Sequence, residues 1–367
     1  MSADGPRVMR LDERQDLIDH VNRVMREEVG SDPTYGEDWP HVHQPENVPN
    51  IFVVREDDQI VASTAIYPHD TRLGDVELRI GGINGVSTDV PYRRRGYATR
   101  VLDACIERMA ELGSHVSLLS TGVPSWYRKQ GWEYGGTVRV YRFDRGNRLF
   151  LPSEPVPEVR QATDEDFEAL SEINEARAWG AVRPPDHMRA MLQRRSSTVW
   201  VAERDGRAGA YVFARGTSMA EYGGPADLVV PMIARLLAEW DDPAVKTSTQ
   251  SVAERQAGQS PTVHATLAAP ARADDVTDVL DAVGIMRSAD YIGMIRIEDP
   301  VGLVRAYGRA DLDPVDEGNS ISMTLGSQRT RLSRNDAVKL LFGPERPPGI
   351  NDPGLPLAFH EWSADRV

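Results

Sequence analysis

Residues 85–99 read Gly-Val-Ser-Thr-Asp-Val-Pro-Tyr-Arg-Arg-Arg-Gly-Tyr-Ala-Thr, and this stretch decides the fold of the first part of the chain. An extended run over 76–90 leads into a basic turn, and a helix is predicted to start at Gly96 and continue to about residue 113. The apolar side chains of this helix share one stripe at helical spacing: Ala98, Val101, Leu102, Cys105, Met109 and Leu112. We therefore expect a strand–turn–helix unit, with Cys105 as a buried core thiol.

The turn itself has the features of an anion-binding site. The first N–H groups of a helix have no intrahelical partners, and the helix dipole is positive at that end. Gly96 lets the backbone approach a phosphate closely, while Arg93, Arg94 and Arg95 add positive charge. On these grounds alone, a solvated basic turn explains the sequence equally well.

In its context the segment resembles the Gcn5-related N-acetyltransferase (GNAT) superfamily. A strand precedes the turn, and a helix, a buried strand over 116–120 and a short helix over 124–130 follow it. In that superfamily an Arg/Gln-x-x-Gly-x-Gly/Ala turn holds the pyrophosphate of coenzyme A, and Arg93, Gly96 and Ala98 fill those positions. The resemblance implies acetyl-CoA as cosubstrate and no metal. The residues implied to bind it are Val86, Ser87, Thr88, Arg93, Arg94, Arg95, Gly96, Tyr97, Ala98 and Thr99.

A second motif stands downstream of the turn. The run Ser-Trp-Tyr-Arg-Lys-Gln-Gly-Trp over 125–132 resembles the superfamily's late motif, a tyrosine followed by a Gly–aromatic pair. The resemblance implies that Tyr127 is the acid that protonates the leaving thiolate. From the residues alone, a tyrosine that packs on a short helix is the alternative.

The opening of the chain recurs after a Pro-rich linker at 151–157. Residues 160–174 resemble 10–22, and the hairpin over 199–213 resembles the one over 51–66, both at an offset of about 150 residues. The second copy has only Glu-Tyr-Gly-Gly-Pro, residues 221–225, where the first has its basic turn. From Tyr291 onward, short strands and short helices alternate. We predict an α/β (α+β) chain with a catalytic acetyltransferase domain over 1–150, a degenerate copy over 157–288 and a small α+β domain over 290–367.

This layout resembles the Eis-like (enhanced intracellular survival) acetyltransferases, whose third domain resembles a sterol carrier protein. The resemblance implies two tandem GNAT folds, direct attack of an amine on the acetyl carbonyl, and a homo-oligomer, either a trimer or a hexamer. It also implies that the C-terminal carboxylate, here that of Val367, is the catalytic base. A frayed terminus is the ordinary expectation from the residues. The order Val90-Pro91 departs from the family's Ala-Pro, which leaves the acceptor open.

The loop over 30–50 is a candidate wall of the acceptor pocket. The residues grouped here are Tyr35, Glu37, Asp38, Trp39, His41 and His43. Their carboxylates and aromatic faces favour a cation; loop packing is equally consistent with these residues. If the terminus is not the base, the candidates are Glu27, Glu28, Glu37 and Asp38. His41 and His43 lack a third ligand at fixed spacing, so we expect no metal there.

The net charge and the cysteine count limit the kinds of partner and the compartment that we expect. A formal net charge of −14 repels phosphate backbones, so nucleic acid is not expected. A single cysteine excludes an intrachain disulfide and agrees with a reducing cytoplasm, and we see neither a membrane span nor a secretory signal. We predict a cytoplasmic N-acetyltransferase that acts on a primary amine of a small cationic molecule or a lysine side chain. The alternatives are a non-catalytic CoA- or acyl-binding protein and a lipid carrier.

Overall fold

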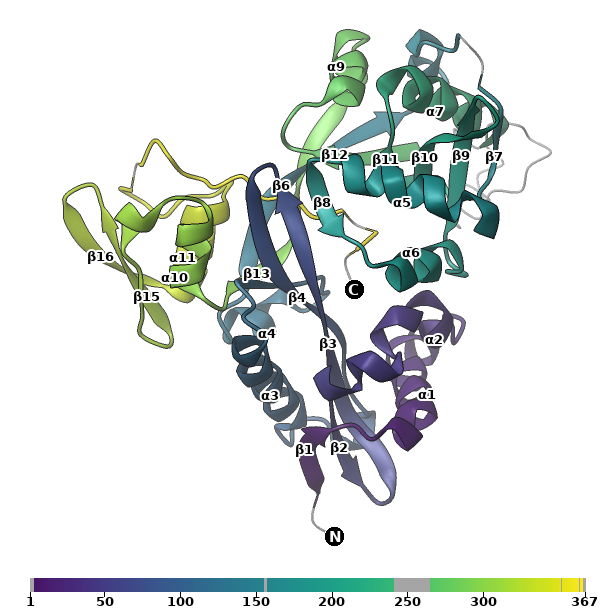
Figure 1. Ribbon diagram of the computed structural model, residues 1–367. Helices are drawn as coiled ribbons and strands as arrows, with labels where there is room; N and C mark the ends of the chain where they lie inside the picture. The colour runs from purple at the N-terminus through teal and green to yellow at the C-terminus, as the bar shows by residue number, and fades with distance from the viewer. Residues whose placement is uncertain (1–2, 155–156, 241–264, 351, 363, 366–367) are drawn as a thin grey trace, which may run out of the picture. The chain divides into compact units, whose positions relative to one another are not determined.

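The computed structural model describes residues 3–154, 157–240, 265–350, 352–362 and 364–365 (Figure 1). It divides into two compact units. The first comprises the described residues up to Gly136 together with Gly293–Phe359, and the second comprises Thr137–Ile292 and His360–Asp365. The division falls inside two strands, between residues 136 and 137 and between residues 292 and 293. Residues 293–359, most of the third domain predicted over 290–367, belong to the first unit.

The first unit contains one mixed sheet with helices on both faces. Its N-terminal part consists of β1 (Asp4–Val8), α1 (Arg14–Met25), α2 (Tyr35–Asp38), β2 (Ile51–Glu56), β3 (Gln59–Leu73), β4 (Val76–Thr88), α3 (Tyr97–Glu111), β5 (Val116–Leu119), α4 (Pro124–Arg128) and the start of β6 (Glu133–Phe143). The strands β1 to β4 pair antiparallel in chain order, and β4 pairs parallel with β5. The predicted strand–turn–helix is therefore confirmed, and the expected loop over 30–50 contains α2 and short 3₁₀ turns.

Alternation along β2 explains why helices cover both faces of the sheet. Ile51 and Val53 pack in a cluster with Leu17 and Val21 of α1. Phe52 and Val54 pack in another cluster with the α3 stripe, in which Val101, Leu102, Cys105 and Met109 are buried. Successive strand residues point to opposite faces, so one strand serves both layers. Figure 1 shows α3 on one side of β3 and β4, and α1 and α2 on the other.

The first unit also receives the C-terminal part of the chain. That part consists of the end of β13 (Arg287–Ile297), α10 (Pro300–Ala306), β14 (Val315–Asp316), β15 (Ser320–Leu325), β16 (Gln328–Ser333) and α11 (Arg334–Phe342). Met294 of β13 pairs antiparallel with Leu119 of β5. The Asn335 side-chain amide of α11 donates to the Trp132 carbonyl at 2.8 Å. These contacts attach the C-terminal elements to β5, which precedes α4, and to the residues that follow α4.

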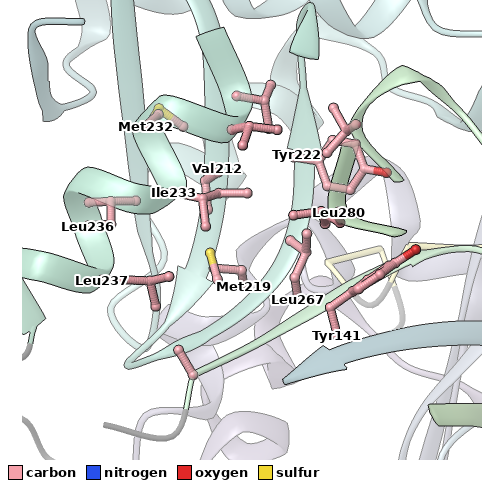
Figure 2. Packing of buried hydrophobic residues seen from close by; sticks show 14 of the residues in the cluster. Tyr141, Val212, Met219, Tyr222, Met232, Ile233, Leu236, Leu237, Leu267 and Leu280 are labelled. Carbon is pink, nitrogen blue, oxygen red and sulfur yellow. The ribbon is translucent and has the colours of Figure 1, made fainter. Parts of the chain in front are cut away.

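In the second unit the strands follow the order β6-β12-β11-β10-β9-β7. Its elements are β7 (Val159–Gln161), α5 (Phe167–Ala176), β8 (Trp179–Val182), α6 (Pro185–Leu192), β9 (Thr198–Arg204), β10 (Arg207–Arg215), β11 (Ser218–Gly223), α7 (Ala226–Trp240), β12 (Ala265–Pro270) and α9 (Asp275–Ala282). Met232, Ile233 and Leu236 of α7 pack against the sheet residues Val212 and Met219 (Figure 2). The element order repeats that of the first unit, with β11 and β12 parallel.

Within the described ranges, no helix combines the length and apolar character that crossing a membrane requires.

Candidate functional site

A cavity of about 550 Å³ opens where β4 continues past its pairing with β5. The two strands pair only from Ile80 to Gly82 of β4, so the end of β4 is free to contact other groups. The end of β4, the basic turn, the start of α3 and the helix α4 line the cavity. Its lining residues are Val24, Val86, Ser87, Thr88, Tyr92, Arg93, Arg94, Gly96, Tyr97, Ala98, Thr99, Val123, Trp126 and Tyr127. We name this the β4–α3 cavity.

The turn presents backbone donors to the β4–α3 cavity. Gly96 precedes α3 with a φ of 81°, and a Cβ added there would meet no atom within 4 Å. Arg94 also adopts a positive φ, of 65°. The N–H of Arg100 bonds to the Gly96 carbonyl at 3.1 Å, so the N–H groups of the preceding residues lie before the first intrahelical bond. An anion at this point would meet donors and the positive end of a 15-residue helix.

The predicted cofactor side chains fall into two groups. Arg93 lines the cavity, donates to the Thr88 carbonyl at 3.0 Å, and bonds both carboxylate oxygens of Glu28 at 2.7 and 2.9 Å. Arg95 does not line the cavity, because its guanidinium bonds Glu56 at 3.0 Å. The Thr88 hydroxyl is buried and has no hydrogen-bond partner among the described residues. A ligand in the cavity would therefore find an unpaired hydroxyl and exchangeable arginine contacts, which fits a phosphorylated cosubstrate.

Tyr127 lines the same cavity. Its side chain is 6% exposed and sits edge-on to Trp126 and Trp132, with ring centroids 4.7 and 6.1 Å away. Burial raises the pKa of Tyr127 well above its ordinary value. The phenol therefore keeps its proton at neutral pH, as a proton donor must.

A second cavity, of about 390 Å³, shares Val86, Val123 and Tyr127 with the first. We name it the Tyr35 cavity. Its other lining residues are Met25, Arg26, Tyr35, Trp39, Ile83, Asn84, Gly85, Leu119, Ser120, Thr121 and Gly122. The hydroxyl of Tyr35 bonds the Asn84 side chain. Two cavities that meet at a protonated phenol provide separate places for two reactants.

The residues predicted to bind an acceptor lie in different surroundings in the structure. Trp39 lines the Tyr35 cavity. Asp38 is 4% exposed and pairs with Arg26 at 3.2 Å. Glu37 and Glu27 line a different hollow, along α1. None of the four side-chain carboxylates named as candidate bases, those of Glu27, Glu28, Glu37 and Asp38, lines either of the two cavities that meet at Tyr127.

Two other expectations concern the chain terminus and a pair of histidines. Val367, the proposed base, lies outside the described residues. His41 and His43 are buried among aromatic rings, with His43 4.6 Å from Tyr35 and His41 4.6 Å from Tyr67. In the described part of the chain, no group of three or more His, Cys, Asp or Glu side chains is placed to hold a metal ion.

Sequence reasoning missed several residues of the site. Arg26 and Asn84 line the Tyr35 cavity, and His20 contacts Ser87. Tyr35 belongs to the loop expected to wall the acceptor pocket, and it lines this cavity. Asn84 immediately precedes the quoted stretch on the same strand, so its position was available in the sequence. Arg26 carried no such signal, because it enters through the fold at the end of α1.

A protein-family model matches the part of the chain that contains this site. Residues 6–135 match the family described as Acetyltransferase (GNAT) domain. The matched range begins in β1 and ends in β6, so it contains both the basic turn and Tyr127. No curated protein sequence matches the chain.

Solved structures extend the similarity to most of the chain. A GCN5-related N-acetyltransferase from Kribbella flavida is 18% identical, with a TM-score of 0.56 over 90% of this chain and 79% of that one. A probable N-acyltransferase from Enterococcus faecalis is 14% identical, with a TM-score of 0.58 over 91% and 86%. Eis1 from Mycobacterium abscessus is 14% identical, with a TM-score of 0.54 over 90% and 85%. The chain therefore has a GNAT acetyltransferase fold.

Proposed function

We propose that this protein transfers an acetyl group from acetyl-CoA directly to a primary amine, either of a small cationic molecule or of a lysine side chain. One observation carries the proposal. The anion-binding turn, the free end of β4 and Tyr127 line one cavity, and a second cavity meets it at Tyr127. The GNAT match over these residues supports acyl transfer as the reaction class.

Different segments of the chain would bind different parts of acetyl-CoA. The start of α3 would hold the pyrophosphate, with Arg93 exchanging Glu28 for phosphate oxygens. The end of β4, from Val86 to Thr88, would bind the pantetheine arm through its backbone. Because Tyr127 lines the same cavity, this placement would bring the thioester near the phenol.

The proposed transfer is direct and forms no covalent enzyme intermediate. The amine nitrogen bonds to the acetyl carbon, and the carbon–sulfur bond breaks in the tetrahedral adduct. The departing thiolate takes the proton of Tyr127, and the amine loses its proton to a base. For the base we keep the proposal of the Val367 carboxylate. A short C-terminal extension should then lower kcat strongly without weakening acetyl-CoA binding, and an extended protein with full kcat would exclude it.

The element order supports a duplicated acetyltransferase fold. The series α5, β9, β10, β11, α7, β12 follows the series α1, β2, β3, β4, α3, β5 in type and pairing. Residues 221–225, before α7, contain no arginine. We propose that the second copy keeps the fold without binding acetyl-CoA, and that residues 293–359 are the sterol-carrier-like part of an Eis-like chain.

The test of the function is turnover followed by two readouts. Acetyl-CoA is incubated with the protein and a panel containing a polyamine, an aminoglycoside and a lysine peptide. Free CoA thiol and the mass of the amine product are then measured. We expect thiol release matched by a gain of one acetyl group on at least one amine. Acetyl-CoA binding without acetylation of any amine would support the non-catalytic CoA-binding alternative instead.

A further inference from the structure

The free end of β4 contains a bulge that is held by side chains from behind. Ser63 of β3 pairs with Ser87 of β4, but Ala65 pairs with Asn84, so β4 has one extra residue between these pairs. Gly85 takes up the extra length with a φ of 64°. A Cβ at this position would lie 2.7 Å from the Tyr35 hydroxyl. The bulge sets the direction of the strand over which Val86, Ser87 and Thr88 line the β4–α3 cavity.

Two buried hydroxyls converge on the carbonyl of the bulge. The Ser63 and Ser87 Oγ atoms each lie 3.1 Å from the Gly85 carbonyl oxygen, and 2.9 Å from each other. Both serines are nearly inaccessible, with exposed fractions of 1% and 4%. Their hydroxyls therefore serve the bulge and not the solvent.

His20 of α1 completes this cluster. Its Nε2 lies 2.9 Å from the Ser87 Oγ, and the residue is 1% exposed. Four contacts need a proton: two at the Gly85 carbonyl, one between the hydroxyls and one between Ser87 and His20. The two hydroxyls supply only two protons, so a third contact is satisfied only when Nε2 carries a proton and donates it to Ser87.

The contacts of the second ring nitrogen, Nδ1, are consistent with that tautomer. The Nδ1 atom lies 3.5 Å from the Arg23 guanidinium and 3.6 Å from an Asp89 carboxylate oxygen. Arg23 also donates to both oxygens of Asp89, at 2.8 and 3.1 Å. Burial lowers the pKa of His20 to about 4, so the ring is neutral near pH 7. A neutral ring with its proton on Nε2 presents a lone pair on Nδ1 toward the arginine.

We propose that His20, as a hydrogen-bond donor to Ser87, is a positioning residue that holds the β4 bulge in the conformation required for acyl transfer. The inference rests on the proposed function, because it assigns the bulge to the part of β4 that faces the thioester. His20 lies behind the strand, so it acts on the reaction through Ser87 and Gly85. Loss of the donor should misplace the thioester more than the phosphates, which bind at the start of α3.

The experiment compares variants that keep or remove the donor. His20→Leu removes it, His20→Gln keeps an N–H that can reach Ser87, and Ser87→Ala removes the partner. His115→Leu is the matched control, because His115 also forms one hydrogen bond in this unit, from the Arg79 N–H to its Nδ1, but lies outside both cavities. For each protein we would measure kcat for acetyl transfer and the Kd of acetyl-CoA by calorimetry.

We expect His20→Leu to lower kcat tenfold or more while the Kd of acetyl-CoA stays within threefold. His20→Gln should recover most of kcat, the double variant His20→Leu/Ser87→Ala should be no slower than His20→Leu, and His115→Leu should match the wild type. A residue that merely stabilised the fold would not split kcat from Kd in this way. Should His20→Leu fail to fold, Ser87→Ala decides the question, since it removes the same hydrogen bond.

Two results would overturn the inference, and they are distinguishable. An active wild type whose kcat is unaffected by His20→Leu and Ser87→Ala contradicts the positioning role alone. A wild type that binds acetyl-CoA but acetylates no amine contradicts the proposed function as well.

Discussion

Gly96 is the residue that best tests where the phosphates bind. It has a positive φ and open space beside it, and it lines the β4–α3 cavity. Gly96→Glu would place a carboxylate where the phosphates are proposed to lie. We expect the Kd of acetyl-CoA, measured by calorimetry, to rise tenfold or more, which is about 1.4 kcal/mol or greater.

A matched control for Gly96 exists in the same unit. Gly74, in the turn between β3 and β4, has a φ of 71° and no atom within 4 Å of an added Cβ. Gly74→Glu carries the same backbone strain and charge but lies away from the cavity, so its Kd should equal that of the wild type. Gly224, the counterpart in the second copy, is unsuitable because a Cβ there would lie 2.7 Å from the Ala210 Cα. Equal Kd values for Gly96→Glu and Gly74→Glu would contradict the placement.

A substitution at Tyr127 tests the chemical step separately from acetyl-CoA binding. Tyr127→Phe removes the acidic proton but keeps the ring that packs against Trp126 and Trp132. We expect kcat to fall by roughly 10²–10⁴, the range for loss of a general acid, while the Kd of acetyl-CoA stays unchanged. Steady-state kinetics and calorimetry measure the two effects. A kcat near that of the wild type would make Tyr127 a packing residue.

Residues near the motifs were predictable from the sequence, and residues brought in by the fold were not. Most of the proposed cofactor residues line one cavity because they are adjacent in the chain, on a strand, a turn and a helix start. Arg95 was included because the sequence does not show which way consecutive arginines point, and Glu56, 39 residues away, draws it aside. The sequence does not distinguish Glu37 and Asp38 from their neighbour Trp39, but in the folded chain the three side chains have different surroundings.

At the scale of elements, helical and strand periodicity gave the bounds of α3 and α7 within a few residues. The same reasoning did not find where the C-terminal segment 360–365 docks. Its partners are remote in the sequence, and the hydrogen bond between Arg183 and Asp365 spans 182 residues. Pairing across such separations leaves no local pattern.

A buried ionic cluster anchors this C-terminal segment within the second unit. Asp365 accepts two hydrogen bonds from the Arg183 guanidinium, both at 2.7 Å, and Arg183 also bonds Glu221. The side chains of all three are fully buried, and Arg177 pairs with Glu221 at 2.7 Å. Among the described residues, two arginines thus face these two carboxylates.

Removal of one charge should unbalance the cluster. Asp365→Asn leaves a buried positive charge uncompensated, so we expect the free energy of unfolding to fall by about 3–5 kcal/mol. Urea denaturation measures it. Asp227→Asn is the control, because Asp227 pairs with Arg204 on the surface with 65% of its side chain exposed, and its loss should cost less than about 1 kcal/mol. Equal stability of the two variants would show that the cluster does not anchor the segment.

At the scale of the whole molecule, buried histidines should make stability depend on pH. His43 is inaccessible, and neither ring nitrogen has a hydrogen-bond partner among the described residues. Burial lowers its pKa to about 3, and that of His20 to about 4, from an ordinary value of 6.5. The unfolded chain therefore binds protons at these residues before the folded chain does. Their contribution to stability is full above pH 6.5 and is lost as the pH falls toward 4 and 3.

The size of this loss follows from proton linkage. Below pH 6.5 each such histidine should lower the free energy of unfolding by about 1.4 kcal/mol per pH unit. Glu13 and Asp166 have pKa values below their ordinary range through their arginine partners, and their effect begins only below about pH 4.5, where carboxylates in the unfolded chain take up protons. Between pH 6 and pH 5 the histidines therefore lower the stability, whereas Glu298 and Asp103, whose pKa values burial raises, act in the opposite direction. His115, half-buried and also lowered in pKa, adds to the slope there.

His43→Phe identifies one share of that slope. Phenylalanine keeps an aromatic ring beside Tyr35 and cannot titrate, so the variant should lose about 1.4 kcal/mol less than the wild type for each pH unit between 6 and 5. Urea denaturation of both proteins at pH 8, 6 and 5 measures the difference, with the pH 8 values setting the cost of the substitution itself. Parallel pH profiles would mean that His43 titrates equally in the folded and unfolded chain. The ring would then have to exchange protons with solvent, which its complete burial contradicts.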